Sequence, residues 1–273
     1  MIARVLSAAL LWLALSGAAL ADRAEQMARL LEVLRIADTV GIMREEGLIY
    51  GADLSESFLG ETAGAAWMAR VESIYAPGRM QELVAGRLET ALADADLAPI
   101  IAYFASEEGQ HILQLELSAR RAFMDAETEE AAMIRYEEAV EADARIVVQI
   151  ETLIADSDLL ERNVAGGLNA NLMFYRGMAD AGGYDGSDED MLRDVWAQEE
   201  DMRVETSRWL ESYLMMAYHP LEPEVLDGYA EFFRTGEGRA LNRALFEAFN
   251  AMYDQLSYLM GSAVAERRLS EQL

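Results

Sequence analysis

Residues 97–125, LAPIIAYFASEEGQHILQLELSARRAFMD, are echoed 129 positions later by residues 226–254, LDGYAEFFRTGEGRALNRALFEAFNAMYD. Each stretch opens with apolar residues at the i, i+3, i+4, i+7 spacing that indicates one face of a helix. These are Leu97, Ile100, Ile101 and Phe104 in the first stretch, and Leu226, Tyr229, Ala230 and Phe233 in the second. Helical spacing resumes farther along both stretches, so each predicts a helix, a tight corner and a second helix.

The corner of each stretch carries a residue suited to begin a helix. Ser106 and Thr235 occupy matched positions. The oxygen of such a side chain accepts a hydrogen bond from the unpaired N–H groups of the first helical turn. Glu107 and Glu237 follow within that turn, where negative charge is favourable beside the positive end of the helix dipole. We therefore predict that a helix starts directly after Ser106 and after Thr235.

A glycine follows each of these residues by three positions, at Gly109 and Gly238. Glycine inside a helix costs roughly 1 kcal/mol relative to alanine. Its presence in both stretches therefore predicts a close approach by the preceding helix, with Phe104 and Phe233 packed over the missing side chains. The alternative is that two of the chain's 19 glycines match by chance.

An aromatic-ended helix followed by Ser or Thr, an acid and Gly resembles a family of exported bacterial proteins known as domain of unknown function 2059. The similarity is concentrated in Leu92–Phe123 and in its echo, Leu221–Met252. The proline that commonly follows the serine in that family is Glu107 in the first copy and Gly236 in the second. The resemblance implies a helical, periplasmic protein, and it brings no catalytic residue.

The first 21 residues, MIARVLSAALLWLALSGAALA, have the features of a secretory signal peptide. One arginine precedes an apolar run, and small residues lead to an A-x-A cleavage site that ends at Ala21. The alternative is a retained membrane anchor, but the run is short and the charged Asp22 follows directly. We expect cleavage after Ala21 and a soluble protein in the periplasm.

Composition excludes several functional classes. The chain has no cysteine, so disulfides, thiol nucleophiles and cysteine-ligated metals are impossible. The formal net charge is −27, and every positively charged side chain is arginine. Because nucleic-acid binding depends on neutralising phosphates, this charge disfavours a nucleic-acid partner. It equally disfavours binding to anionic lipid surfaces.

The chain as a whole predicts an all-α, multi-helix protein, because the alternation typical of half-buried strands does not occur. The 129-residue offset also relates Trp67 to Trp196. We therefore expect two related helical units, residues 22–126 and 159–273, joined by a connector at residues 127–158. We expect the connector to be one long helix, buried nearly all round between Ala144 and Ile154.

One sequence pattern favours a metal site, and we weigh it against a surface role. Glu108 and His111 form an E-x-x-H motif, the spacing that di-iron helical bundles use. Such sites need a second motif, and the second copy has Glu237 but Ala240 in place of the histidine. The sequence therefore predicts no metal, and His111 is expected at the surface.

Other chemical patterns fail in the same way. The acidic run from Tyr184 to Asp190 lacks the Gly and Glu positions of an EF-hand loop, and we interpret Ser187 and Asp190 as a capping box. The 15 methionines are spread along apolar faces, which favours core packing over copper binding. We find no nucleophile elbow, phosphate loop or S-x-x-K motif, so we expect no catalytic residue, no cofactor and no enzyme activity.

The remaining hypotheses concern partners. We prefer a non-catalytic interaction module that presents a helical groove or face to an unknown protein partner. The alternative is a periplasmic carrier of an apolar small molecule or lipid, since helical bundles lined by Met, Phe and Leu can hold a pocket. A large closed cavity between the units would favour the carrier, whereas an exposed apolar strip would favour the module.

Overall fold

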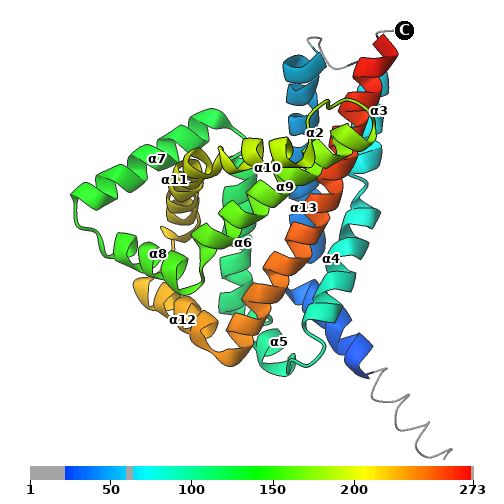
Figure 1. The fold of residues 1–273 in the computed structure, drawn as a ribbon. Helices are drawn as coiled ribbons and strands as arrows, with labels where there is room; N and C mark the ends of the chain where they lie inside the picture. The colour runs from blue at the N-terminus through cyan, green and yellow to red at the C-terminus, as the bar shows by residue number, and fades with distance from the viewer. Residues whose placement is uncertain (1–21, 60–63, 272–273) are drawn as a thin grey trace, which may run out of the picture.

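The structure is a computed structural model that describes residues 22–59 and 64–271 (Figure 1). Residues 22–33 are helical, and twelve further helices follow within the described residues, which contain no strand. Their bounds are α2 Ile36–Leu59, α3 Ala65–Ile74, α4 Pro77–Ala91, α5 Ala98–Phe104, α6 Glu107–Ala122, α7 Ala126–Glu141, α8 Arg145–Asp156, α9 Leu159–Asp180, α10 Asp188–Trp196, α11 Glu199–Tyr218, α12 Pro223–Arg234 and α13 Gly236–Glu271. The expectation of an all-α fold is confirmed.

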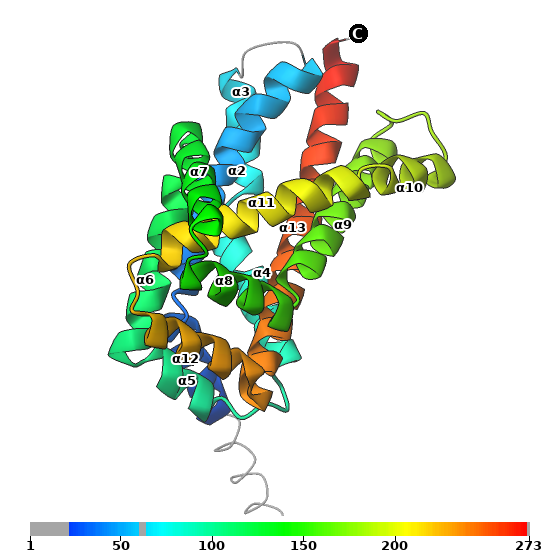
Figure 2. The ribbon, with the colours of Figure 1, turned by 90° about the vertical axis from the view of Figure 1, so that its left-hand side faces the viewer.

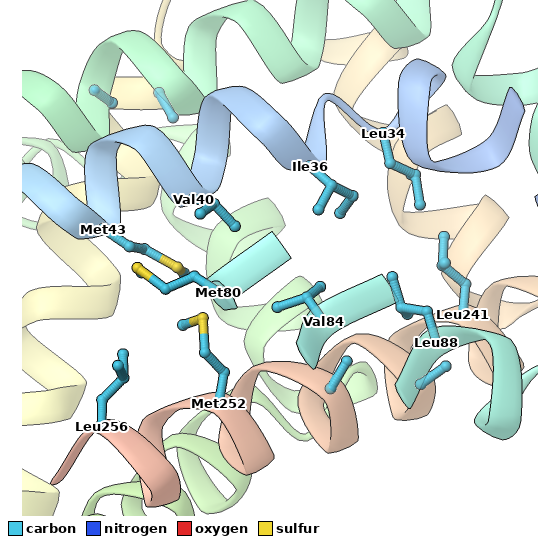
Figure 3. Packing of buried hydrophobic residues seen from close by; sticks show 14 of the residues in the cluster. Leu34, Ile36, Val40, Met43, Met80, Val84, Leu88, Leu241, Met252 and Leu256 are labelled. Carbon is cyan, nitrogen blue, oxygen red and sulfur yellow. The ribbon is translucent and has the colours of Figure 1, made fainter. Parts of the chain in front are cut away.

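The main core lies where α2, α4 and α13 pack together (Figure 3). α13 is 36 residues long and runs through the middle of the molecule beside α4 and α9 (Figure 1). The side chains that meet between these helices are aliphatic or methionine, and they include Val40, Met80, Val84, Leu88, Leu241 and Met252, all buried. Burial of this apolar surface is the main force that holds the first and last thirds of the chain together.

The crossing of α9 and α13 depends on two glycines. A Cβ atom at Gly177 would lie 2.0 Å from the carbonyl oxygen of Tyr258, and one at Gly261 would lie 2.0 Å from that of Phe174. Each helix therefore presents a glycine to the backbone of the other, and any side chain would force the helices apart. The Ser262 hydroxyl adds a hydrogen bond of 3.1 Å to the Gly177 carbonyl oxygen.

The two segments that we expected to be related units pack into one another. α4, from the first segment, lies against α13 of the second, while α11 of the second lies against α6 of the first. Figure 2 shows α11 passing across α6 and α8 on the opposite side from α4. Each segment thus completes its packing with a helix from the other.

The connector differs from the expected single helix. It consists of α7 and α8, which are separated at Asp143, a residue with a left-handed φ of +50°. The N–H of Ala144 bonds to the carbonyl of Ala139, which closes the end of α7. α8 is also not buried all round, because Val148 remains 63% exposed while Val147 is buried.

The predicted signal peptide, residues 1–21 with its cleavage site at Ala21, lies outside the described residues. Within the described residues, no helix is long and apolar enough to span a membrane. Arg23, close behind the predicted cleavage site, donates hydrogen bonds to the carbonyl oxygens of Leu92 and Ala95. These two hydrogen bonds join the start of the described chain to the residues that follow α4.

Candidate functional site

The two corners have the same hydrogen bonds. The Ser106 hydroxyl oxygen accepts from the N–H of Gly109 at 3.0 Å and donates to the carbonyl of Tyr103 at 2.6 Å. The Thr235 hydroxyl accepts from the N–H of Gly238 at 2.9 Å and donates to the carbonyl of Phe232 at 2.7 Å. In each corner, one hydroxyl joins the end of one helix to the start of the next.

The glycines at these corners lie against backbone atoms of the preceding helix. A Cβ atom at Gly109 would lie 2.4 Å from the carbonyl oxygen of Tyr103, and one at Gly238 would lie 2.0 Å from that of Phe232. The next nearest atoms include the Cα of Phe104 and of Phe233, at 2.9 and 2.8 Å. The close approach is therefore made by the main chain, rather than by the phenyl rings that we expected to cover the glycines.

The aromatic rings at the corners instead pack on one another. Tyr103 and Phe232, which occupy matched positions, stack with their centroids 4.2 Å apart. Phe104 is buried and meets Phe232 edge-on at 5.4 Å. Phe233 is partly buried and meets Tyr229 edge-on at 5.1 Å. The two corners thus form one aromatic junction between α5 and α12.

Beside this junction, one residue, Glu116, accepts hydrogen bonds from three tyrosines. Glu116 of α6 accepts hydrogen bonds at its Oε1 from the hydroxyls of Tyr218, at 2.6 Å, and Tyr229, at 2.8 Å. Tyr213 donates to the main-chain carbonyl of Glu116 at 3.1 Å. α6, α11 and α12 converge here, so residues about one hundred positions apart in the chain form one cluster.

Burial raises the pKa of the Glu116 carboxyl, although the hydrogen bonds from Tyr218 and Tyr229 act in the opposite direction. The pKa values of these two tyrosines are raised well above the ordinary value, first by burial and then by the Glu116 charge. Burial and the carboxylates of Glu108 and Glu116 raise the pKa of Tyr103 to about 12. Tyr103, Tyr218 and Tyr229 are therefore neutral at physiological pH, and Tyr218 and Tyr229 act as donors to Glu116.

A second polar group lies one helical turn along α6. Arg120 forms two hydrogen bonds with the carboxylate of Glu46 from α2, at 2.7 and 2.9 Å. It also donates to the hydroxyl of Tyr253 from α13 at 3.2 Å. This two-point geometry fixes the guanidinium, so its charge is already balanced by Glu46.

A cavity of about 240 Å³ opens beside these groups. Its wall combines one acid, one guanidinium and a majority of aromatic and aliphatic side chains from six helices. It is lined by Glu116, Arg120, Leu153, Ser157, Leu159, Asn163, Trp209, Leu210, Tyr213, Leu214, Tyr218, Tyr229, Phe233 and Asn242. The Asn242 amide donates to the Ser157 carbonyl at 2.8 Å and ties the ends of α8 and α13 together at its edge.

The E-x-x-H motif does not take part in this site. Glu108 and His111 are both exposed on α6. Among the residues that the structure describes, no group of three or more His, Cys, Asp or Glu side chains is arranged to hold a metal. Ser187 and Asp190 do form the predicted capping box at the start of α10.

The sequence around Glu116 already indicates a buried polar site. Ile112, Glu116 and Ala119 follow one another on the inward face of α6, where Ile112 and Ala119 are buried. An acid on an otherwise apolar face indicates a polar partner inside the fold. Its tyrosine partners could not be found by spacing, because they lie on α11 and α12.

An exposed apolar surface lies elsewhere, on α10 and the start of α11. Leu192 and Trp196 are 44% and 65% exposed, and they are neighbours on α10 at i, i+4 spacing. Val204 on α11 is 55% exposed. The matched tryptophan, Trp67, is buried at 5% exposure, and its indole N–H donates to the Gly51 carbonyl at 2.7 Å.

The comparisons with known proteins concern the first corner. Residues 78–135 match DUF2059. The profile of that family is described as "Uncharacterized protein conserved in bacteria". The matched residues run from α4 into α7 and include the Ser106 corner, Glu116 and Arg120. The predicted second copy at Leu221–Met252 is outside the match. No curated protein and no solved structure matches the chain.

Proposed function

We propose that the protein is a non-catalytic interaction module that binds a protein partner through Leu192, Trp196 and Val204. Trp196 carries this proposal, because tryptophan is highly buried on average and this one is 65% exposed. Tryptophan is also enriched among the residues that dominate binding energy in protein interfaces. Figure 2 shows α10 at the edge of the molecule.

The charge around Trp196 specifies the kind of partner. Acidic residues precede and follow it in the loop before α10, on α10 and on α11, namely Asp185, Asp188, Glu189, Asp190, Asp194, Glu199, Glu200 and Asp201. A surface of this kind complements an apolar pocket with a basic rim. We therefore expect a partner protein with arginine or lysine around such a pocket, and we expect no nucleic acid.

A photo-crosslinking experiment tests this function. A photoreactive amino acid at the exposed Ala197 should give a defined crosslinked product in the producing cell. The product should disappear when Leu192 and Trp196 are both changed to Ala, and it should weaken as salt is raised. The same photoreactive residue at Val148, which is 63% exposed on α8, is the matched control. Equal products at both positions, or no product at Ala197, would contradict the proposal.

We further propose that residues 22–126 and 159–273 are two related units. The support is the matched set of hydrogen bonds at Ser106 and Thr235, and the reciprocal packing of α4 with α13 and of α11 with α6. A chimera in which residues 232–239 replace residues 103–110 tests this relation. It should fold with near-normal stability if the corners are equivalent, and it should fail to fold if their likeness is superficial.

Export of the protein is part of the proposal. The support is the sequence of residues 1–21 and the hydrogen bonds of Arg23, which join the start of the predicted mature chain to α4 and the loop after it. The intact mass of protein from the periplasmic fraction should correspond to a chain that begins at Asp22. A mass that includes residues 1–21 would contradict cleavage after Ala21.

A second candidate function is carriage of an apolar small molecule. It is favoured by a hollow of about 520 Å³ between α7, α9 and α11, whose wall includes Met133, Met202 and Trp209. Flexible methionines suit varied apolar ligands. Native mass spectrometry of protein taken gently from its own cells should then show a bound lipid or other apolar molecule, whereas the bare mass would leave only the interaction module.

A further inference from the structure

The carboxylate of Glu116 has no positively charged side chain as a partner in the part of the chain that the structure describes. Among the described residues, no arginine or histidine forms an ion pair with it. The nearest arginine along its own helix, Arg120, is already held by two hydrogen bonds to Glu46. Since a buried carboxylate is normally paired with a cation, the site has an excess negative charge.

The Glu116 carboxylate is also only half satisfied by hydrogen bonds. Its Oε1 accepts from both Tyr218 and Tyr229, but no donor to Oε2 is found within the described part of the chain. Glu116 lines the 240 Å³ cavity and is partly exposed. One carboxylate oxygen therefore remains available to a molecule inside the cavity.

Five aromatic side chains form part of the cavity wall, beside leucines and polar groups. On one side, Trp209 and Tyr213 stack with their centroids 4.8 Å apart and their planes within 8°. On the other, Tyr229 meets Tyr218 at 5.9 Å and Phe233 at 5.1 Å. The negative faces of aromatic rings attract cations, and several rings around one carboxylate are suited to an ammonium group with attached methyl or methylene groups.

We propose that this cavity is a binding site for a small organic cation, an amine or quaternary ammonium compound, held by Glu116 and by the rings of Trp209, Tyr213 and Tyr229. The cation would supply the charge that Glu116 lacks. Its hydrocarbon groups would contact the rings, where they displace water. The cavity volume limits the ligand to a small molecule, because it lies below the roughly 300–1,000 Å³ of drug-sized sites. This site is separate from the surface around Trp196.

Calorimetric titration with choline chloride tests the proposal. We expect millimolar or tighter binding to the full mature chain at a fixed ionic strength that screens general attraction to an acidic protein. The matched probe is 3,3-dimethylbutan-1-ol, which has the shape of choline with carbon in place of the charged nitrogen. It should bind roughly tenfold or more weakly, because only the charged probe interacts with Glu116 electrostatically.

Variants assign the binding to this cavity. Glu116→Gln keeps the shape and the oxygen that Tyr218 and Tyr229 donate to, so it should weaken choline binding roughly tenfold or more while the protein stays folded. Glu224→Gln, which removes an exposed acid at 3.2 Å from Arg145, is the control and should leave binding unchanged. Trp209→Leu should weaken binding, and Trp209→Phe should restore part of it.

Three results would overturn the proposal. The first is the absence of choline binding to the folded wild-type chain at millimolar concentrations. The second is equal affinity for choline and its neutral analogue. The third is unchanged choline binding in the Glu116→Gln variant, which would indicate a general effect of the negative surface instead of a site.

Discussion

The corner at Ser106 and the corner at Thr235 are alike in their main-chain geometry, but the side chains around them differ. Both use a hydroxyl, a glycine three residues later and a close approach of the preceding helix. Farther along the following helix, Glu116 in α6 corresponds to Leu245 in α13. Upstream, the buried Trp67 corresponds to the exposed Trp196.

The hydroxyl and the glycine are required by the turn itself, whereas the side chains farther along the helix depend on the helices that pack against them. The corner is fixed by hydrogen bonds between a side-chain hydroxyl and the main chain, and by the space at glycine, and all of these groups are close in the sequence. Glu116 faces tyrosines of α11 and α12, whereas Leu245 packs against the hydrophobic core. The two positions can therefore carry different side chains without any change in the turn itself. Four sets of stability measurements can test this difference between the two corners and their surroundings.

The largest expected difference in the free energy of unfolding is between alanine variants of Trp67 and Trp196. Trp67→Ala should lower the free energy of unfolding by about 4 kcal/mol, because it removes a buried ring and leaves the Gly51 carbonyl without its donor. Trp196→Ala should change it by less than about 0.5 kcal/mol, since the side chain is 65% exposed. Urea unfolding of both variants checks this. Similar losses would mean that Trp196 is covered in the folded protein.

Substitution of the corner glycines should cause the next largest loss of stability. Gly109→Ala and Gly238→Ala should each cost about 3 kcal/mol, because the new Cβ would meet a carbonyl oxygen of the main chain at 2.4 or 2.0 Å. Gly86→Ala is the control. Gly86 lies inside α4 with nothing within 4 Å of the added Cβ, so this change should stabilise the protein by up to about 1 kcal/mol. A neutral result at Gly109 or Gly238 would refute the close approach in that corner.

The hydroxyl groups of Ser106 and Thr235 should contribute less to stability than the corner glycines. Ser106→Ala and Thr235→Ala should each lower stability by about 1 kcal/mol, since each removes the acceptor for a first-turn N–H. Ser106→Thr and Thr235→Ser keep the oxygen and should cost a smaller amount. Thermal unfolding of the four variants compares the corners directly. A loss of stability at only one corner would show that the matched hydrogen bonds contribute unequally to stability.

An effect of similar size to that of the hydroxyls is expected at Glu116, and it should depend on pH. Because burial raises the pKa of Glu116 above its ordinary value of 4.5, the folded protein binds this proton more tightly than the unfolded chain. The wild type should therefore lose stability relative to Glu116→Gln as pH rises from 4.5 through the raised pKa. At neutral pH the variant should be more stable by about 1 kcal/mol. Urea unfolding at pH 4 and 7 measures the difference, and a constant difference would contradict the assignment.

The corners were predictable from sequence because their causes are local. A cap, an acid and a glycine within four positions specify the start of a helix, and Ser106 and Thr235 form the hydrogen bonds that this pattern predicts. The capping box of Ser187 and Asp190 was predictable for the same reason. In each case, the atoms that interact are close in the sequence.

Other features depended on distant or context-dependent causes. The break at Asp143 lacks proline and glycine, and it uses the left-handed conformation that Asp adopts more readily than most residues. The cluster at Glu116 needs the crossing of α6 with α11, which spacing along the chain does not reveal. The exposure of Trp196 likewise follows from where α10 lies, because the residue type alone predicts burial.

The position of α13 in the chain order has a consequence for biosynthesis. This helix of roughly 54 Å contacts α2, α3, α4, α5, α9 and α12, so helices from both segments complete their burial against it. Met80, Val84 and Leu88 therefore cannot be covered until the residues after 236 have been synthesised. Until then, a nascent or truncated chain exposes an apolar face that chaperones and proteases recognise. Quality control would thus act on the whole chain at once, with no intermediate stage at which the first half is finished.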